Sequence, residues 1–224
     1  MANAGSSWRV AIVHPGEDAI GNLVVGGDCR EVLGTNEDLA GTHRAMLEAT
    51  LRGSSLGLAE AIRNARLPEA DNVLIVMDQF EELFRFKRSK LTRNSSDEAV
   101  ACVKLLLEAS QQREVPVYVV LTMRSEFIGD CMAFPGLPDA MTQGQYLIPR
   151  MSRDELHTAI TGPVTLSGAA IAPRLVTRLL NEVGDERDSL PVLQHALRRT
   201  WDEWHENHSD GEPMDLRHYE AIGT

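Results

Sequence analysis

The sequence predicts an α/β protein in which a parallel sheet is followed by an all-helical segment. Two uninterrupted apolar runs, 73–77 and 115–122, are typical of strands that are covered on both faces, and a helix-length segment separates them. A strand, helix, strand order of this kind forms a right-handed parallel unit. After about Ser152 the strand pattern stops and only amphipathic segments follow.

The elements expected in order are these. In the first half we expect strands at 8–14, 73–77 and 115–122, helices at 36–52 and 55–66, a helix or turn at 79–86, and a helix that begins at Ser95 or Ser96. In the second half we expect a short last strand at 146–148 and helices at 153–160, 172–183 and 190–204. The boundary is expected at 149–152, which divides the chain into domains 1–150 and 151–224.

Composition and charge exclude several classes of function. With 224 residues, 43% hydrophobic and 25% charged, the chain has the make-up of an ordinary globular protein. A formal net charge of −11 argues against direct nucleic-acid binding, and we interpret the basic stretch 85–90 as a solvated loop. Three cysteines without C-x-x-C spacing argue against a disulfide framework or a thiolate zinc site. Since no apolar run is long enough to span a bilayer and no signal segment follows Met1, we expect a cytoplasmic protein.

The sharpest motif follows the central strand, where Asp78 is succeeded within one turn by Glu81 and Glu82. Open parallel sheets bind ligands at the carboxyl ends of their strands. In P-loop ATPases an aspartate at this position holds Mg²⁺, and a nearby acid orients or deprotonates the attacking water. We assign the first role to Asp78 and the second to Glu81 or Glu82. The alternative is that both glutamates only favour a helix N-terminus through its dipole.

A second polar motif ends the next strand, where Thr122 and Arg124 supply a hydroxyl and a guanidinium. A cation at this edge can read a terminal phosphate. The alternative for Arg124 is an ion pair with Glu126 or with a carboxylate of the first motif.

These motifs and two others resemble one known family. The strings are WRVAIVHPG at 8–16, DQFEELF at 78–84, TMRSEF at 122–127 and LPVLQHAL at 190–197. In this order they resemble the STAND ATPase domains that are often fused to WD-repeat propellers in bacteria. The resemblance covers nearly the whole chain, and DQFEELF is its most specific part.

The resemblance implies a P-loop NTPase-like parallel sheet and a helical lid, with ATP and Mg²⁺ bound between them. It makes Asp78 the Walker B aspartate, which holds Mg²⁺ through water, and it likens Glu81 and Glu82 to the paired acids of the NACHT pattern. Arg124 is then the sensor arginine, and Thr122 contributes to nucleotide binding.

Pro191 matches the proline of the lid's G-x-P motif, which packs near the adenine, although Ser189 stands where the motif has glycine. The function implied is a nucleotide-dependent switch or scaffold for effector assembly in signal transduction.

The main departure from the family is the phosphate-binding loop. The sequence contains no G-x-x-x-x-G-K-[ST], and the Gly26-Gly27 pair lacks a following lysine. Family members carry this loop ahead of the strand that begins at Trp8, and a winged-helix segment follows their lid, near where Thr224 stands here. We therefore expect a fragment of a signalling ATPase, with an incomplete sheet, impaired ATP binding and no ATP hydrolysis by the chain alone.

The alternative function is a non-enzymatic protein-interaction module on a degenerate ATPase fold. An incomplete parallel sheet exposes a backbone edge and an apolar face, which favours self-association or protein partners.

Overall fold

The computed structural model describes residues 7–25, 32, 40–68, 70–88, 93–113, 116–183 and 189–223. Contacts divide the chain into two units, Met1–Leu147 and Ile148–Thr224. Within the described ranges, no helix has the length and apolar character needed to cross a bilayer.

A parallel sheet forms the centre of the first unit. Its order is β1-β2-β3, with the strands Ser7–Val13, Asp71–Met77 and Val117–Leu121. Val13 pairs with Met77, and Met77 with Leu121, so all three strands end at the same level. The predicted α/β class with a parallel sheet is confirmed.

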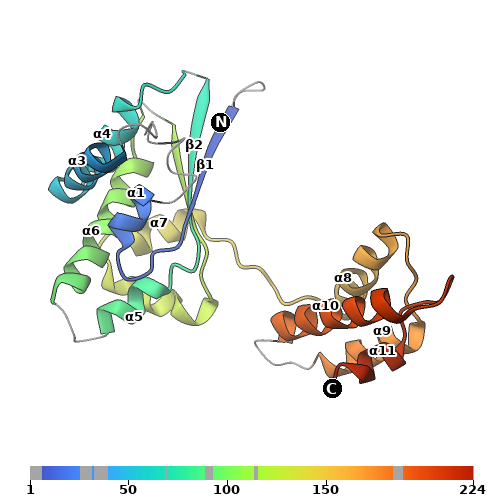
Figure 1. The fold of residues 1–224 in the computed structure, drawn as a ribbon. Coiled ribbons are helices and arrows are strands. Elements are labelled where there is room, and N and C mark those ends of the chain that lie inside the picture. The colour runs from blue at the N-terminus through green and yellow to red at the C-terminus, as the bar shows by residue number, and fades with distance from the viewer. Residues whose placement is uncertain are drawn as a thin grey trace. The chain divides into compact units, whose positions relative to one another are not determined.

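The helices of this unit cover one face of the sheet. They are α1 (Ala19–Val25), α3 (Ala40–Gly53), α4 (Gly57–Asn64), α5 (Glu82–Arg88), α6 (Arg93–Ser110), the 3₁₀ helix η2 (Ser125–Ala133) and α7 (Leu137–Gly144). In Figure 1, α1, α3, α4 and α6 lie on the same side of the strands. Ala11, Ile75 and Val117 on this inner face are buried in one core with Cys102 and Leu106 of α6.

Several local expectations need correction. The helices α1, η2 and α7 were not expected; α1 has three β-branched residues and one glycine, yet burial of Ile20 and Leu23 stabilises it. Segment 146–148 is not a strand but exposed, unpaired chain. Arg85, which we placed in a solvated loop, belongs to α5. The expected helix start at 36 and Cys29 both lie outside the described residues, whereas Cys102 and Cys131 are buried free thiols.

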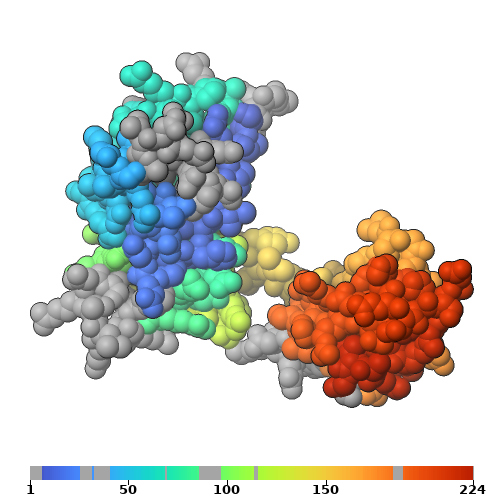
Figure 2. Space-filling model, in the orientation of Figure 1, coloured from blue at the N-terminus to red at the C-terminus, as the bar shows by residue number. Residues whose placement is uncertain are grey.

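The outer face of the sheet is apolar and exposed in the described part of the chain. Alternate residues of each strand point to it, and the exposed ones are Trp8, Val10, Ile12, Tyr118 and Val120. The rings of Trp8 and Tyr118 lie 5.1 Å apart between centroids. β1, coloured dark blue, reaches the surface in Figure 2. Faces of parallel sheets are normally covered, so this patch is suited to bind another apolar surface.

The second unit is built from helices. They are α8 (Arg153–Leu166), α9 (Pro173–Glu182), α10 (Ser189–Asn207) and α11 (Leu216–Ala221). A capping box starts α8, since Ser152 accepts from Glu155 N–H and the Glu155 carboxylate accepts from Ser152 N–H. The core includes Ile160, Leu175 and Trp204.

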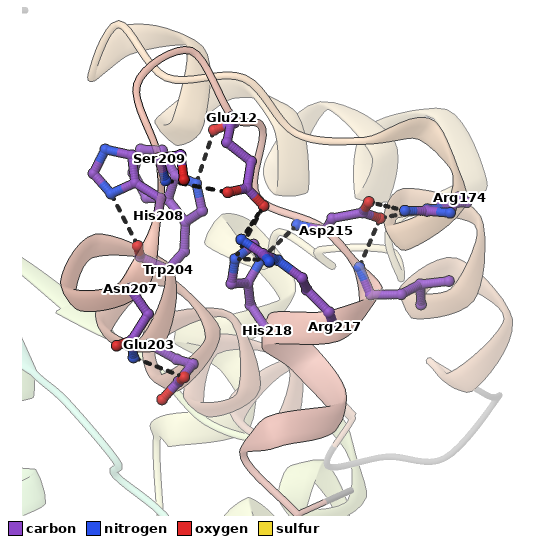
Figure 3. Close-up of polar contacts among 11 residues, drawn as sticks. Arg174, Glu203, Trp204, Asn207, His208, Ser209, Glu212, Asp215, Arg217 and His218 are labelled. Carbon is purple, nitrogen blue, oxygen red and sulfur yellow. Dashed lines mark hydrogen bonds and ion pairs between the residues drawn. The ribbon is translucent and has the colours of Figure 1, made fainter.

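A network of hydrogen bonds stabilises the segment between α10 and α11 (Figure 3). The indole N–H of Trp204 donates to Glu212 O at 3.0 Å, and Arg174 Nε donates to Asp215 Oδ1 at 2.6 Å. This hydrogen bond from Arg174 is the main reason why the pKa of Asp215 is lowered. Asp215 N–H donates to Nδ1 of the buried His218, so the ring must leave that nitrogen unprotonated. α9, α10 and α11 are thereby tied together.

A carboxylate pair, Asp18 just before α1 and Glu98 of α6, contacts one arginine of α3. Arg52 of α3 contacts Asp18 Oδ1 at 2.8 Å and Glu98 Oε1 at 3.2 Å. Burial, and then the hydrogen bond with Asp18, raises the pKa of Glu98. Burial opposes ionisation of Asp18 too, but hydrogen bonds with Glu98 and Gly21 N–H and the charge of Arg52 outweigh it and lower the pKa of Asp18.

We predict that Val120→Lys reduces self-association of the chain. A charge in the middle of the exposed apolar face opposes the burial of this face against a second apolar surface. Light scattering should show oligomers for the wild type and a larger monomer fraction for the variant. Leu166→Lys is the matched control, because Leu166 is 90% exposed and belongs to the second unit. A monodisperse wild-type monomer contradicts the prediction.

We predict that Glu98→Gln raises the melting temperature at pH 7 and that Asp18→Asn lowers it. The raised pKa of Glu98 means that its contribution to stability is complete below the unfolded value and is lost as pH rises through the folded value. Because the pKa of Asp18 is lowered, its ionised form stabilises the folded chain at pH 7, and this contribution is lost as pH falls through the folded value. Changes of about 1–3 °C are expected. The gain from Glu98→Gln should vanish in a melting series taken down to pH 4, and a gain independent of pH would refute the assignment.

Candidate functional site

The three strands bring three polar residues together at their carboxyl ends. His14, Asp78 and Thr122 follow the paired residues Val13, Met77 and Leu121. Thr122 Oγ1 donates to Asp78 Oδ1 at 2.5 Å, and His14 Nδ1 lies 3.8 Å from Asp78 Oδ2. Asp78 and Thr122, which the sequence analysis selected from separate motifs, are therefore direct neighbours.

The turn after β2 is strained and tightly bound to β3. Gln79 has a φ of +55°, a region that residues with a side chain rarely adopt. Its N–H donates to Thr122 Oγ1 at 3.2 Å, and the next amide, that of Phe80, donates to Thr122 O at 2.9 Å. Phe80 itself is fully buried. These bonds and this burial hold the turn against a backbone penalty of about 1–2 kcal/mol.

The two glutamates of the motif have different surroundings. Glu81 is only 8% exposed, and its Oε2 is buried without a hydrogen-bond partner among the described residues. Glu82 is less buried, and its Oε2 accepts a hydrogen bond from Gly16 N–H at 2.9 Å. A buried carboxylate oxygen without a partner is costly, so Glu81 is prepared to accept a hydrogen bond from a ligand or water.

Arg124 faces this buried acid. Its Nε lies 3.9 Å from Glu81 Oε1, while its side chain is 58% exposed. This contact is an ion pair with a carboxylate of the first motif, which the sequence analysis gave as an alternative role for Arg124. A pair this long and this exposed contributes little to stability.

A cavity of about 460 Å³ lies beside these groups. It is lined by Gln79, Glu81, Glu82, Arg85, Thr122, Met123 and Arg124. Two guanidinium groups and two carboxylates around one space suit a ligand that carries anionic oxygens together with hydrogen-bond donors or bound water. Glu81, Glu82, Thr122 and Arg124 are thus brought to one site.

Pro191 belongs to the second unit and is exposed near the beginning of α10. That unit has its own groove of about 570 Å³, almost entirely apolar. Its lining consists of Met151, Ala159, Ile160, Pro163, Val164, Ser167, Leu190, Leu193, Gln194, Leu197, Arg198, Trp201 and Met214. Pro191 is next to Leu190 of this lining but does not itself line the groove.

The described residues contain no cluster of three or more histidine, cysteine, aspartate or glutamate side chains that could by itself hold a metal ion. A divalent cation beside Asp78 must therefore complete its shell with water or ligand oxygens. Mg²⁺ is commonly bound in this way, by one or two carboxylates together with phosphate oxygens and water. The carboxylate of Asp78 and the hydroxyl of Thr122 fit such a cation.

Three residues of the site were not selected from the sequence. Gly16 and His14 belong to the loop after β1, and only the common level of the strand ends places them near the motif. Arg85 could have been found, because it follows Glu81 by four residues and would share a helix face with it.

A parallel sheet with acids, a hydroxyl and a guanidinium at its carboxyl edge defines an α/β protein compatible with a P-loop-like fold. Residues 1–224 match the family model described as Novel STAND NTPase 1, and the chain belongs to this family. The resemblance found in the sequence motifs is thereby confirmed. No curated protein matches the chain.

We predict that Gln79→Gly leaves the free energy of unfolding unchanged or raises it by about 1 kcal/mol, because glycine removes the strain at positive φ. The matched control is Gln194→Gly in the exposed part of α10, which should lower stability by about 1 kcal/mol. Urea unfolding followed by circular dichroism compares the two. Equal losses in both variants would show that Gln79 is unstrained.

Proposed function

We propose that this chain is a nucleotide-dependent switch or scaffold for effector assembly, with the terminal phosphates of ATP bound at the carboxyl edge of the β1-β2-β3 sheet. Membership of a STAND NTPase family supports nucleotide and Mg²⁺ use. The observation that carries the proposal is the buried Glu81 Oε2, which has no hydrogen-bond partner among the described residues, in a cavity that Arg85 and Arg124 also line. In such a site the two arginines can bind an anion, and the Glu81 carboxylate can accept a hydrogen bond from a donor.

In this proposal Asp78 and Thr122 hold Mg²⁺, with Asp78 acting through bound water. The cation would neutralise charge on the phosphate oxygens. Asp78 remains 41% exposed at its side chain, so one of its oxygens is accessible to a hydrated cation.

Glu81 would be the carboxylate that orients or deprotonates the attacking water where a phosphate-binding loop completes the site. Its free oxygen accepts a hydrogen bond, and its burial keeps bulk water from competing for that oxygen. Arg124 contacts the terminal phosphate, where a guanidinium can donate two parallel hydrogen bonds. Glu82 is less suited to the acid role because its Oε2 already accepts from Gly16 N–H.

The helical unit 148–224 acts as the lid in this proposal. Pro191 is the residue of this unit that matches the proline of the family's G-x-P motif. Ser189 precedes Pro191 at the position that is glycine in the family motif, which is a small change in side-chain volume.

We propose weak nucleotide binding and little or no hydrolysis for these 224 residues. The sequence has no G-x-x-x-x-G-K-[ST], whose backbone amides and lysine supply most of the charge stabilisation for a triphosphate.

The alternative function is a non-enzymatic interaction module. It is favoured by one observation, the exposed apolar outer face of the sheet with Trp8, Ile12 and Val120. The two functions differ in their dependence on Asp78, since partner binding through this face does not require that carboxylate.

We predict that a fluorescent ATP analogue binds this chain only in the presence of Mg²⁺ and that Asp78→Ala weakens binding by about tenfold or more. Fluorescence anisotropy measures both affinities. Asp202→Ala removes one exposed acid from α10 and should have no effect. Absence of binding to the wild type rejects the nucleotide proposal and leaves the interaction module.

A further inference from the structure

The loop between β1 and α1 is anchored by side chains from two helices. Glu82 of α5 accepts a hydrogen bond from Gly16 N–H at 2.9 Å. Asn22 of α1 donates to Pro15 O at 2.9 Å and to His14 O at 3.3 Å. Three consecutive residues of the loop, 14–16, are therefore each held by a side-chain hydrogen bond.

Gly16 adopts a conformation that this anchoring requires. Its φ is +55°, and a Cβ placed on it would lie 2.8 Å from Asn22 Nδ2. A side chain at this position would strain the backbone and push against the amide group that holds the loop. The glycine thus allows Asn22 and Glu82 to bind the same short loop.

The loop carries His14 to the edge of the candidate site. His14 follows the residue that pairs with Met77, so its register position is level with Asp78. Its Nδ1 lies 3.8 Å from Asp78 Oδ2, whereas the Thr122 hydrogen bond uses the other carboxylate oxygen, Oδ1. The position of His14 next to Asp78 therefore depends on where the loop is held.

We propose that Glu82 is a positioning residue, whose carboxylate holds the loop 14–16 and so keeps His14 beside Asp78. Of the two glutamates, Glu81 is the one that interacts with the ligand. The role in ligand binding rests on the proposed function, but the anchoring of the loop does not. One carboxylate oxygen of Glu82 accepts a hydrogen bond from Gly16 N–H. By contrast, Glu81 has a buried oxygen, Oε2, without a hydrogen-bond partner among the described residues.

The competing explanation is that Glu82 only stabilises the N-terminus of α5 by its charge, since it is the first residue of that helix. Two conservative substitutions separate the explanations. Glu82→Gln keeps the length and an acceptor oxygen but removes the charge. Glu82→Asp keeps the charge but is shorter by one methylene and does not reach Gly16 N–H.

The decisive experiment is amide and imidazole NMR on the 224-residue chain. We expect the Gly16 amide to lose its hydrogen-exchange protection in Glu82→Asp and Glu82→Ala and to keep it in Glu82→Gln. The His14 ring signals should move in the same two variants. Glu81→Gln is the control and should leave Gly16 and His14 unchanged. If Glu82→Asp behaves as the wild type and Glu82→Gln as Glu82→Ala, the charge explanation holds and the proposal is wrong.

The second measurement is the affinity of each variant for the Mg²⁺-bound fluorescent ATP analogue. We expect Glu82→Ala and Glu82→Asp to weaken it by about three- to tenfold, and Glu82→Gln by less than about twofold. Equal affinities in all variants would reject the effect on the ligand. If the wild type does not bind the analogue, the proposed function fails, and the NMR result still decides whether Glu82 anchors the loop.

Discussion

The common level at which the three parallel strands end is the constraint on which the rest of the site depends. Because Val13, Met77 and Leu121 are register partners, the residues that follow them must meet at one edge. Backbone hydrogen bonds extend this register by one residue, from Asp78 N–H to Val13 O at 2.8 Å and from Thr122 N–H to Met77 O at 3.0 Å. The backbone ladder itself therefore places these polar side chains.

Two unfavourable features are concentrated at this edge. Gln79 has a left-handed backbone conformation, and Glu81 has a buried oxygen that no described residue hydrogen-bonds. The fully buried Phe80 between them supplies the packing that tolerates both. Strain and unsatisfied polar groups collect where a protein binds or reacts, because a site optimised for stability would have no capacity left for a ligand.

The exposed face of the sheet and the candidate site are continuous. Strand alternation that points Val10, Ile12, Tyr118 and Val120 outward continues to His14 and Thr122 at the strand ends. A partner that covered the apolar face would therefore end beside the candidate site. In the proposed function, this continuity would give the nucleotide and a partner one shared surface.

By itself, the sequence determined the type and order of the main elements and the identity of the acidic motif. Buried parallel strands are near-continuous apolar runs, so 73–77 and 115–122 are recognisable locally, and Asp78, Glu81, Glu82, Thr122 and Arg124 follow from their positions after these runs. The short helix α1 was missed because its residues favour strands and only burial makes it helical. The tertiary structure alone decided that Glu81 Oε2 is buried without a hydrogen-bond partner among the described residues, while Glu82 Oε2 accepts from Gly16 N–H. These two adjacent glutamates have the same local chemistry, and what separates them is contact with a loop 66 residues earlier in the chain, which no local pattern encodes.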